Sequence, residues 1–402
     1  MKWINKAKLK DPPVLIRWEP MYGNDQYIFY DEEGFLCQIS KKDILKSNGV
    51  RIITPSHKLL DGPAYIAPVM AQIKITNACN FHCHGCYAKS GKRDIQEMST
   101  EQLMNLIDRL AKWGVLIIQW VGGEVFLKKN FSILVAHAYK LGLQQYLLTN
   151  GYIFGKKTKS FSRKAWGYFS LIQVSVDGVA DSFDQHVQKQ NAWQIVKKGL
   201  QNLGKTKPIN CKLKIATIST MKLVPEIELL CEEISQIEGV DVWKLGKEIS
   251  SGRSKIKEVE SLQAQIKVWA EIKKLSTTLE VQTYFDKELT PTEISPEIFD
   301  DPGARDFIYI FHNGDTYPRP LMAEWKQFCG GNCMTNSLED IWYSENFQKI
   351  RSVTRKETGC EDCALTCAQR GLDQRLNLFD NEVNLRIRPL SHPGCKFYKE
   401  RR

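Results

Sequence analysis

The feature that most constrains this chain is a group of three cysteines within eight residues. Cys79, Cys83 and Cys86 are spaced C-x3-C-x2-C in the stretch ITNACNFHCHGCYAKS, so their thiolates come from one loop that can wrap a single inorganic centre. Structural zinc takes four protein ligands, and His82 or His84 could supply the fourth. Iron–sulfur cubanes are also held mainly by cysteines. Three cysteines without an evident fourth favour a cluster with one open iron.

The segment from Ala71 onward predicts strands that alternate with helices. Ser99, followed three residues later by Gln102, predicts the start of a helix that Gly114 ends. We also expect Gly204 to end a helix that spans about 193–203. Strands are expected at 71–75, 115–121, 144–148, 171–176, 212–218 and 240–245. This alternation predicts a parallel sheet with right-handed crossovers, and six strands rather than eight indicate an open barrel.

Polar motifs stand directly after the predicted strands. The cysteine loop follows the first strand, and Gly122, Gly123 and Glu124 form a GGE turn after the second. In such folds the carboxyl ends of the strands meet at one edge, where the chemistry takes place. The stretch CNFHCHGCYA together with the GGE turn resembles the radical S-adenosylmethionine (SAM) superfamily, over roughly residues 68–255.

This resemblance implies an α/β fold built on a partial (β/α)6 barrel of the TIM type. Cys79, Cys83 and Cys86 would hold a [4Fe–4S] cluster whose open iron binds SAM. The reduced cluster would cleave SAM to methionine and a 5′-deoxyadenosyl radical, which abstracts a hydrogen from a substrate carbon. The cofactors would perform the radical chemistry, and the protein would bind and orient them.

The same resemblance implies a set of SAM contacts at the strand ends. The GGE turn would meet the amino group, Arg253 the carboxylate, and the residues that end the next two strands the ribose or the carboxylate. For Asn150 and Asp177, a local role as turn residues is an equal alternative. Gly85 stands where the superfamily usually has an aromatic residue or His, which removes the basis for a ring contact to the adenine. The full set is Gly122, Gly123, Glu124, Thr149, Asn150, Ser175, Asp177 and Arg253.

A second group of cysteines follows a predicted β-hairpin at 307–318. The stretches HNGDTYPRP, CEDCALTC and HPGC resemble the SPASM or twitch domains that carry auxiliary clusters in radical SAM maturases. Arg319 stands where those domains usually have Cys, and a zinc knuckle at 360–367 is the alternative. The implied ligands of one auxiliary [4Fe–4S] cluster are Cys360, Cys363, Cys367 and Cys395, and Cys329 and Cys333 are the cysteines available for a second.

The chain divides into four expected parts. Residues 1–70 form a β-rich extension, with strands at 14–18, 27–30 and 35–39 and a short helix at 41–46. This extension resembles at most half of the leader-binding module of peptide-modifying relatives, and a hairpin packed on the barrel is the alternative. Residues 71–255 form the barrel, 256–305 a bridging helix and linker, and 306–402 the SPASM-like domain.

Composition and charge indicate the class of protein and its cellular compartment. The 56 basic and 46 acidic residues give a net charge of +10, mostly scattered, which indicates a solvated surface. No interleaving of aromatic and basic residues predicts nucleic-acid binding. No run approaches the roughly 18 apolar residues of a membrane span, and MKWINKAKLKDPP has no apolar signal region. Clustered cysteines in such a chain indicate metal binding, so we expect a cytoplasmic iron–sulfur protein.

The hypothesis that these features favour is an enzyme that crosslinks or otherwise oxidises a ribosomally made precursor peptide. Flavodoxin or ferredoxin would supply electrons. Alternatives are a protein oxidase similar to anaerobic sulfatase maturases, and a small-molecule radical SAM dehydrogenase or decarboxylase. A non-catalytic zinc-binding or electron-carrying adaptor would have no need of the GGE turn.

The cysteine groups predict a metal content. Anaerobically reconstituted protein should hold about 8 iron per chain with one auxiliary cluster, or about 12 with two, because each cubane holds four irons. Replacement of Cys395 should remove one cluster and reduce SAM cleavage only in part. Iron analysis checks both numbers, and zinc in place of iron at the C-terminal cysteines would contradict the SPASM-like interpretation.

Overall fold

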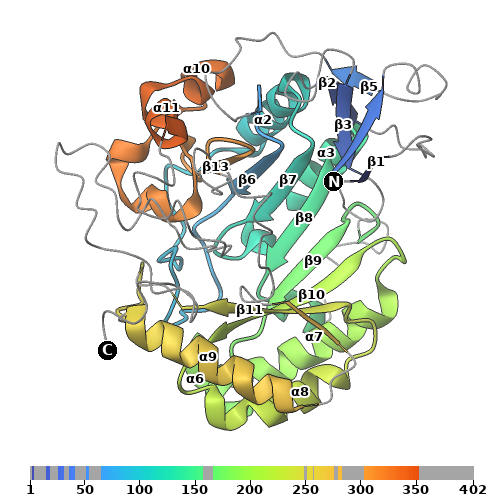
Figure 1. The fold of residues 1–402 in the computed structure, drawn as a ribbon, viewed down its shortest axis with the longest axis vertical. Coiled ribbons are helices and arrows are strands. Elements are labelled where there is room, and N and C mark those ends of the chain that lie inside the picture. The colour runs from blue at the N-terminus through green and yellow to red at the C-terminus, as the bar shows by residue number, and fades with distance from the viewer. Residues whose placement is uncertain are drawn as a thin grey trace.

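The computed structural model describes 2–3, 15–18, 26–30, 36–40, 51–53, 65–156, 166–248, 251–256, 258–275, 279–282 and 303–352. Within these residues the strands form one five-stranded and one ten-stranded sheet (Figure 1). The predicted helix at 41–46 lies outside the described residues, as do Cys360, Cys363, Cys367 and Cys395. None of the described helices is both long and apolar enough to cross a membrane.

The five-stranded sheet belongs to the N-terminal extension and has the order β1-β4-β3-β2-β5. Its strands are β1 (Lys2–Trp3), β2 (Leu15–Trp18), β3 (Gln26–Tyr30), β4 (Leu36–Ser40) and β5 (Arg51–Ile53). The three predicted strands are confirmed as β2, β3 and β4. The buried Arg17 side chain donates from Nη1 to the carbonyls of Pro68 (2.9 Å) and Gly114 (3.0 Å). The extension is therefore fastened to the larger sheet.

The larger sheet confirms the six predicted strands as adjacent, parallel neighbours. These are β6 (Met70–Lys74), β7 (Ile117–Val121), β8 (Gln144–Thr149), β9 (Leu171–Ser175), β10 (Lys212–Ser219) and β11 (Val242–Lys247). Two further parallel strands extend this array, β12 (Glu280–Gln282) beside β11 and β13 (Phe307–Ile310) beside β6. They pair the edges that six strands alone would leave open. The sheet thus continues into the region expected to form the C-terminal domain.

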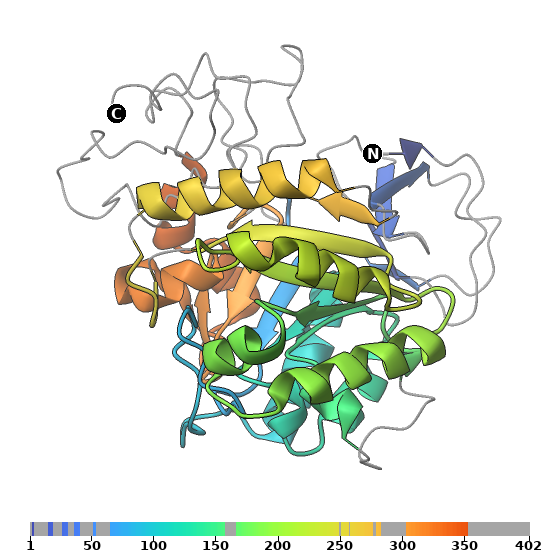
Figure 2. The ribbon, with the colours of Figure 1, turned by 90° about the horizontal axis from the view of Figure 1, so that it is seen from below.

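Helices cover one side of this curved sheet, and Figures 1 and 2 show α7, α8 and α9 along the β9–β11 end. On β8, β9 and β10, buried and partly exposed residues alternate. Leu147, Ile172 and Ile215 lie in the core under the helices, while Gln173 and its neighbour Lys214 face the concave side. The helices are α2 (Thr100–Trp113), α3 (Phe131–Lys140), α4 (Tyr152–Gly155), α6 (Ala180–Val187), α7 (Ala192–Thr206), α8 (Ile227–Ser235) and α9 (Glu258–Lys274), with 3-10 helices η2 (Val125–Leu127) and η3 (Val224–Glu226).

Local sequence signals explain both ends of α2. Ser99 caps α2 through a capping box with Gln102, and Gly114 ends it with φ 104°. The expectation for Gly204 was wrong, because α7 continues through it to Thr206. A Cβ at this position would overlap the carbonyl oxygen of Glu238, so the glycine allows a close approach of α7 to the loop before β11.

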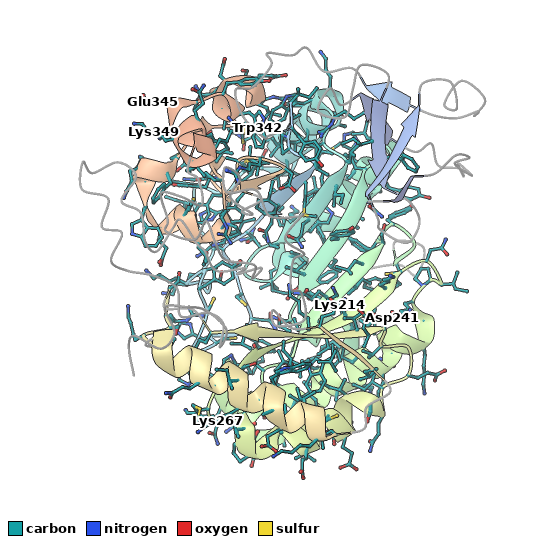
Figure 3. The ribbon with its side chains drawn as sticks, in the orientation of Figure 1. Lys214, Asp241, Lys267, Trp342, Glu345 and Lys349 are labelled. Carbon is teal, nitrogen blue, oxygen red and sulfur yellow. The ribbon has the colours of Figure 1, made fainter. Side chains whose placement is uncertain are left out.

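Amphipathic spacing places α9 on the barrel. Ala264, Val268 and Ile272 recur every four residues and are buried, while Lys267 lies on the outer side of the helix (Figure 3). Such a stripe is typical of a surface helix that packs on a core.

The C-terminal described segment packs against the other edge of the sheet. It comprises β14 (Asp315–Tyr317), η5 (Pro320–Glu324), η6 (Lys326–Phe328), β15 (Gly331–Asn332), α10 (Leu338–Trp342) and α11 (Glu345–Ser352). The guanidinium of Arg109 on α2 donates to the carbonyls of Cys333 and Asn336. The Trp342 ring packs edge-on against Trp113 at 6.0 Å, and Figure 3 shows Trp342 beside α11. This segment is thereby joined to the carboxyl-terminal half of α2, which leads into β7.

Candidate functional site

The cysteine loop begins at the carboxyl end of β6 and is held at both of its sides. Cys79 N donates to Gly91 O (2.9 Å), which closes the loop on itself. On the other side, His82 N and His84 N donate to the carbonyls of Val187 and His186 at the end of α6. The three cysteines of the loop are half-buried.

The surroundings of these cysteines suit a metal centre. Burial raises the pKa of Cys79 to about 11 and also raises the pKa of Cys83, so neither is a free thiolate nucleophile at neutral pH. A bound metal supplies the positive charge that deprotonates a coordinating thiol. In the described part of the chain, no group of three or more Cys, His, Asp or Glu side chains is arranged to hold a single metal ion. Since His82 and His84 are exposed, the arrangement fits a cluster, whose irons lie apart, better than mononuclear zinc.

The GGE turn lies directly against the entry to this loop. Gly123 N donates to Thr76 O and Glu124 N to Ala78 O, both at 2.8 Å. A Cβ on Gly123 would overlap the carbonyl oxygen of Ala78, and one on Gly122 would lie 3.0 Å from that of Thr76. The turn therefore requires glycine at Gly123 because two backbone segments meet there.

The Glu124 carboxylate joins the motifs at the ends of β7 and β8. It accepts from Thr149 Oγ1 at 2.8 and 3.0 Å and from Asn150 N at 2.9 Å. Burial raises the pKa of Glu124 to about 7, although these hydrogen bonds act to lower it. The amide of Asn150 also donates to Asn80 Oδ1 in the cysteine loop (2.9 Å). Three motifs far apart in sequence thus form one connected group.

Ser175 and Asp177 lie at the end of β9, where a pocket of about 440 Å³ opens between α6, η3 and the cysteine loop. Asp177 lines this pocket together with Gly85 and Glu248. Its Oδ1 accepts from Ile218 N (2.7 Å), and burial raises its pKa. Ser175 is exposed on the concave side of the sheet, beside Ala216 of β10. At Gly85 the pocket wall lies close to Glu248, since a Cβ on Gly85 would be 3.3 Å from Glu248 Oε1.

Arg253 supports the cysteine loop from the far end of the sheet. Its Nε donates to Cys83 O and its Nη1 to Ser90 O, both at 2.8 Å, while its backbone N donates to Cys86 O at 3.0 Å. The preceding Gly252 has φ 63°, and a Cβ there would overlap the Cys86 carbonyl oxygen. At least two of the guanidinium donors therefore hold the loop backbone.

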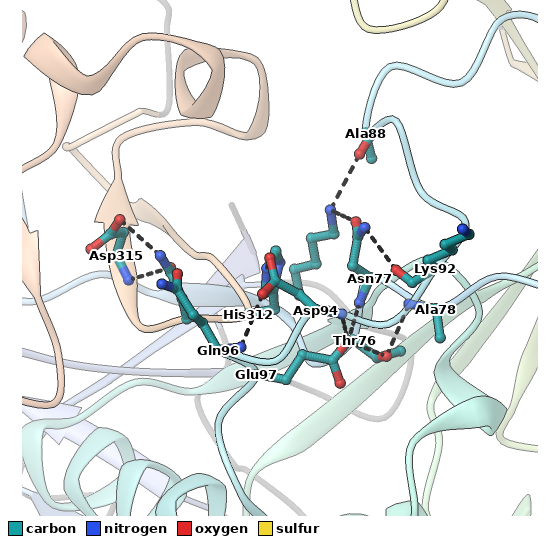
Figure 4. A network of polar contacts seen from close by, with 12 residues as sticks. Thr76, Asn77, Ala78, Ala88, Lys92, Asp94, Gln96, Glu97, His312 and Asp315 are labelled. Carbon is teal, nitrogen blue, oxygen red and sulfur yellow. Dashed lines mark hydrogen bonds and ion pairs between the residues drawn. The ribbon is translucent and has the colours of Figure 1, made fainter.

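A polar network that the sequence did not reveal fixes the outgoing half of the loop (Figure 4). Glu97 Oε1 accepts from Thr76 Oγ1 and Asn77 N, both at 2.8 Å. Asp94 Oδ2 lies 2.9 Å from Nε2 of His312, just after β13. No motif marks Asp94 or Glu97, because their partners lie elsewhere in the sequence and meet them only in the folded chain.

Lys74 is a further residue that sequence reasoning missed. It is a fully buried strand residue of β6, and its Nζ donates to Asn77 Oδ1 (2.8 Å) and Ala88 O (3.3 Å). The same ammonium lies 4.5 Å from the centre of the Phe311 ring. Burial lowers its pKa to about 8. Lys74 therefore places a cation beside the cysteine loop and the segment after β13.

The second group of cysteines is described only in part. Cys333 is buried in the core, and burial raises its pKa to about 12. Cys329 is half-buried next to β15. Their role as cluster ligands stays a prediction. Cys211 and Cys231 lie in the core, as expected for isolated cysteines.

Comparison with protein families agrees with this geometry. Residues 73–221 match the model of the radical SAM superfamily. Residues 303–367 match SPASM, described as an iron–sulfur cluster-binding domain. The first match includes the cysteine loop, the GGE turn and the ends of β8 and β9, and the second includes five of the six C-terminal cysteines.

Individual proteins resemble the chain over parts of its length. Sporulation killing factor maturation protein SkfB of Bacillus subtilis is 29% identical over 54% of this chain, and the match spans only 56% of SkfB. Mycofactocin maturase MftC of Mycolicibacterium smegmatis is 23% identical over 76% of this chain and 78% of its own. The structure of Streptococcus suis SuiB bound to precursor peptide SuiA superposes with a TM-score of 0.58 at 16% identity, covering 72% and 68% of the two chains. This likeness establishes a shared fold.

The contact between Gly123 and Ala78 generates a prediction. Gly123→Ala should displace the cysteine loop, because overpacking against backbone cannot be relieved by a rotamer change and costs about 1–3 kcal/mol. The variant should bind clearly less iron at the N-terminal cluster, measured by iron content and electron paramagnetic resonance. Gly91→Ala is the matched control, since its Cβ would have only an ordinary 3.7 Å contact with His82 Nδ1. Equal iron content in the two variants would contradict this account.

Proposed function

Because this chain belongs to the radical SAM superfamily and carries a SPASM domain, we propose that it oxidatively modifies a ribosomally synthesised precursor peptide. The product would carry a side-chain crosslink or a related modification. The observation that carries this proposal is the joining of cysteine loop, GGE turn and the Thr149–Asn150 motif into one site at the carboxyl ends of the strands. An adaptor without catalysis has no use for such a site.

The residues at the strand ends have distinct proposed roles. When bound, the [4Fe–4S] cluster and SAM supply a radical that removes a hydrogen atom from the substrate. Cys79, Cys83 and Cys86 would hold that cluster. The Gly122–Glu124 turn would face the amino group of SAM, with the Glu124 carboxylate already oriented by Thr149 and Asn150.

The remaining SAM contacts would come from the other half of the sheet. Ser175 and Asp177 would face the ribose, and the pocket of about 440 Å³ that Asp177 lines would receive the adenosyl portion. Arg253 would act first by holding the cysteine loop through the Cys83 and Ser90 carbonyls, and would reach the SAM carboxylate with its remaining guanidinium donors. Hydrogen bonds from preorganised groups orient the cofactor without reorganisation during the reaction.

Several observations support a peptide as the substrate. SkfB and MftC are maturation proteins by name, and SuiB shares the fold in a structure with a precursor peptide. In this chain β5 and β1 are the outer strands of the five-stranded sheet. An extended peptide can pair its backbone with such an edge. We infer that residues 1–70 bind the leader part of the peptide, so that the modified residues reach the concave side of the barrel.

The electron flow would use both cysteine groups. The C-terminal cysteines, Cys360, Cys363, Cys367 and Cys395 with Cys329 and Cys333, would hold the auxiliary cluster or clusters that accept the electron released from the substrate radical. A flavodoxin or ferredoxin would reduce the first cluster. The enzyme would work in the cytoplasm, where thiols stay reduced. Protein oxidation of the kind that sulfatase maturases perform, or turnover of a small metabolite, is the alternative outcome that substrate tests would reveal.

A first test concerns the cluster. The anaerobically reduced protein should cleave SAM to 5′-deoxyadenosine, and the Cys79→Ala, Cys83→Ala, Cys86→Ala triple variant should lose this activity to background, because no iron is held for SAM. Chromatography of the nucleoside product measures the rate. A double Cys211→Ala, Cys231→Ala variant is the control, since both cysteines lie in the core away from the loop. Wild-type rates in the triple variant would refute the assignment.

A second test concerns the leader. Deletion of residues 1–60 should weaken binding of a labelled precursor peptide at least about tenfold, because the edge strands for backbone pairing are removed. Uncoupled SAM cleavage by the same protein shows that its barrel is intact, since Arg17 also ties the extension to Pro68 and Gly114. Unchanged peptide affinity would exclude the leader-binding role, and efficient turnover of a free metabolite would favour the small-molecule alternative.

A further inference from the structure

A small surface patch outside the cysteine loop combines exposed aliphatic and cationic side chains. Ile95 is 100% exposed and Leu127 is 39% exposed. Arg93 Nη2 donates to Leu127 O (2.6 Å), so the two segments lie side by side. Lys92, Arg93 and Lys129 are exposed around the two aliphatic residues. We refer to Lys92, Arg93, Ile95, Leu127 and Lys129 as the Ile95 patch.

The acidic residues of the same stretch do not neutralise this patch. Asp94 is turned toward His312, with its Oδ2 2.9 Å from Nε2. Glu97 accepts from Thr76 and Asn77 and pairs with the buried Lys128 at 3.6 Å. Figure 4 shows both carboxylates directed into the network. The outward charge of the patch is therefore positive.

The Ile95 patch is the outer surface of the segment that pairs with the cluster loop. Gly91 and Ala78 form a β-bridge, with Cys79 N donating to Gly91 O at 2.9 Å. Asn77 Nδ2 donates to Lys92 O at 3.1 Å. One residue of the patch is thus hydrogen-bonded to the turn that leads into the first cluster ligand. Because electron tunnelling slows steeply with distance, a donor docked here would have a short route to the cluster.

We propose that the Ile95 patch is the docking surface for an acidic one-electron carrier protein that reduces the radical SAM cluster. This inference rests on the proposed function. In the step concerned, the carrier loses one electron and the cluster gains it, without transfer of a proton or atom. Such encounters use small interfaces, and complementary charge raises their association rate.

Other occupants fit the patch less well. A second copy of this chain carries the same net charge of +10 and would present cations to cations. The precursor peptide has to reach the concave side of the sheet, where Ser175 is exposed, whereas the patch lies on the outside of the cysteine loop. An acidic carrier with an apolar centre complements both parts of the patch.

A matched control surface exists elsewhere on the molecule. Ile209 lies in the connection from α7 to β10 and is 96% exposed. Lys205, in the last turn of α7, is also exposed. This connection enters β10 at its amino end, whereas the cysteine loop leaves β6 at its carboxyl end. Because the strands are parallel, the two surfaces lie at opposite ends of the barrel.

The experiment compares a patch variant, Lys92→Glu, Arg93→Glu, Ile95→Asp, Lys129→Glu, with a control variant, Lys205→Glu, Ile209→Asp. Oxidised bacterial flavodoxin is the probe, and its Kd for each holoenzyme is measured by calorimetry at low and high salt. The patch variant should bind at least about tenfold more weakly at low salt and lose the salt dependence. The control variant should bind like the wild type. Equal affinities for flavodoxin in patch and control variants would overturn the proposal.

A second readout separates docking from structural damage. SAM cleavage is driven either by reduced flavodoxin or by dithionite, a small reductant that needs no docking surface. The patch variant should lose the flavodoxin-driven rate and keep the dithionite-driven rate. An equal loss with both reductants would show that the substitutions disturb the cluster loop, and would contradict the docking role. Dithionite-driven cleavage also tests the radical SAM assignment by itself, so failure of either proposal can be recognised.

Discussion

The structure depends on one backbone contact, where the GGE turn meets the entry to the cysteine loop. Gly123 N and Glu124 N donate to the carbonyls of Thr76 and Ala78, and no side chain fits between the two segments. This contact sets the distance between the residues proposed to hold the cluster and those proposed to hold SAM. The contact is well defined because it joins backbone atoms at the ends of the adjacent parallel strands β6 and β7. The hydrogen bonds between these two strands fix their register.

Three further supports surround the same loop, and each comes from a different part of the chain. Asn150 reaches it from β8, Arg253 from beyond β11, and Glu97 from the loop's own outgoing half. A metal centre is held well when the surrounding groups orient its ligands. Here most of those supports bind loop backbone rather than cysteine side chains. The loop therefore has a defined path that does not depend on a single contact.

The site and the surface proposals follow from the same topology. Parallel strands bring their carboxyl ends to one edge, so the proposed substrate side is the concave face, while the outside of the cysteine loop remains accessible. The carboxylates of Asp94 and Glu97 are directed into the network beside His312, so the charged side chains on the outer surface of this segment are cationic. Structural support of the loop and the charge of its outer surface thus have a common cause.

Sequence alone determined the chemistry and the order of elements. The spacing of Cys79, Cys83 and Cys86, the GGE turn and the cap at Ser99 are local signals, because each depends on residues close in the chain. Tertiary structure decided the rest: the pairing of β12 with β11 and of β13 with β6, and the close approach at Gly204. It also decided the burial of Lys74 and the partners of Glu97. These depend on contacts between distant segments, which leave no periodicity or spacing in the sequence.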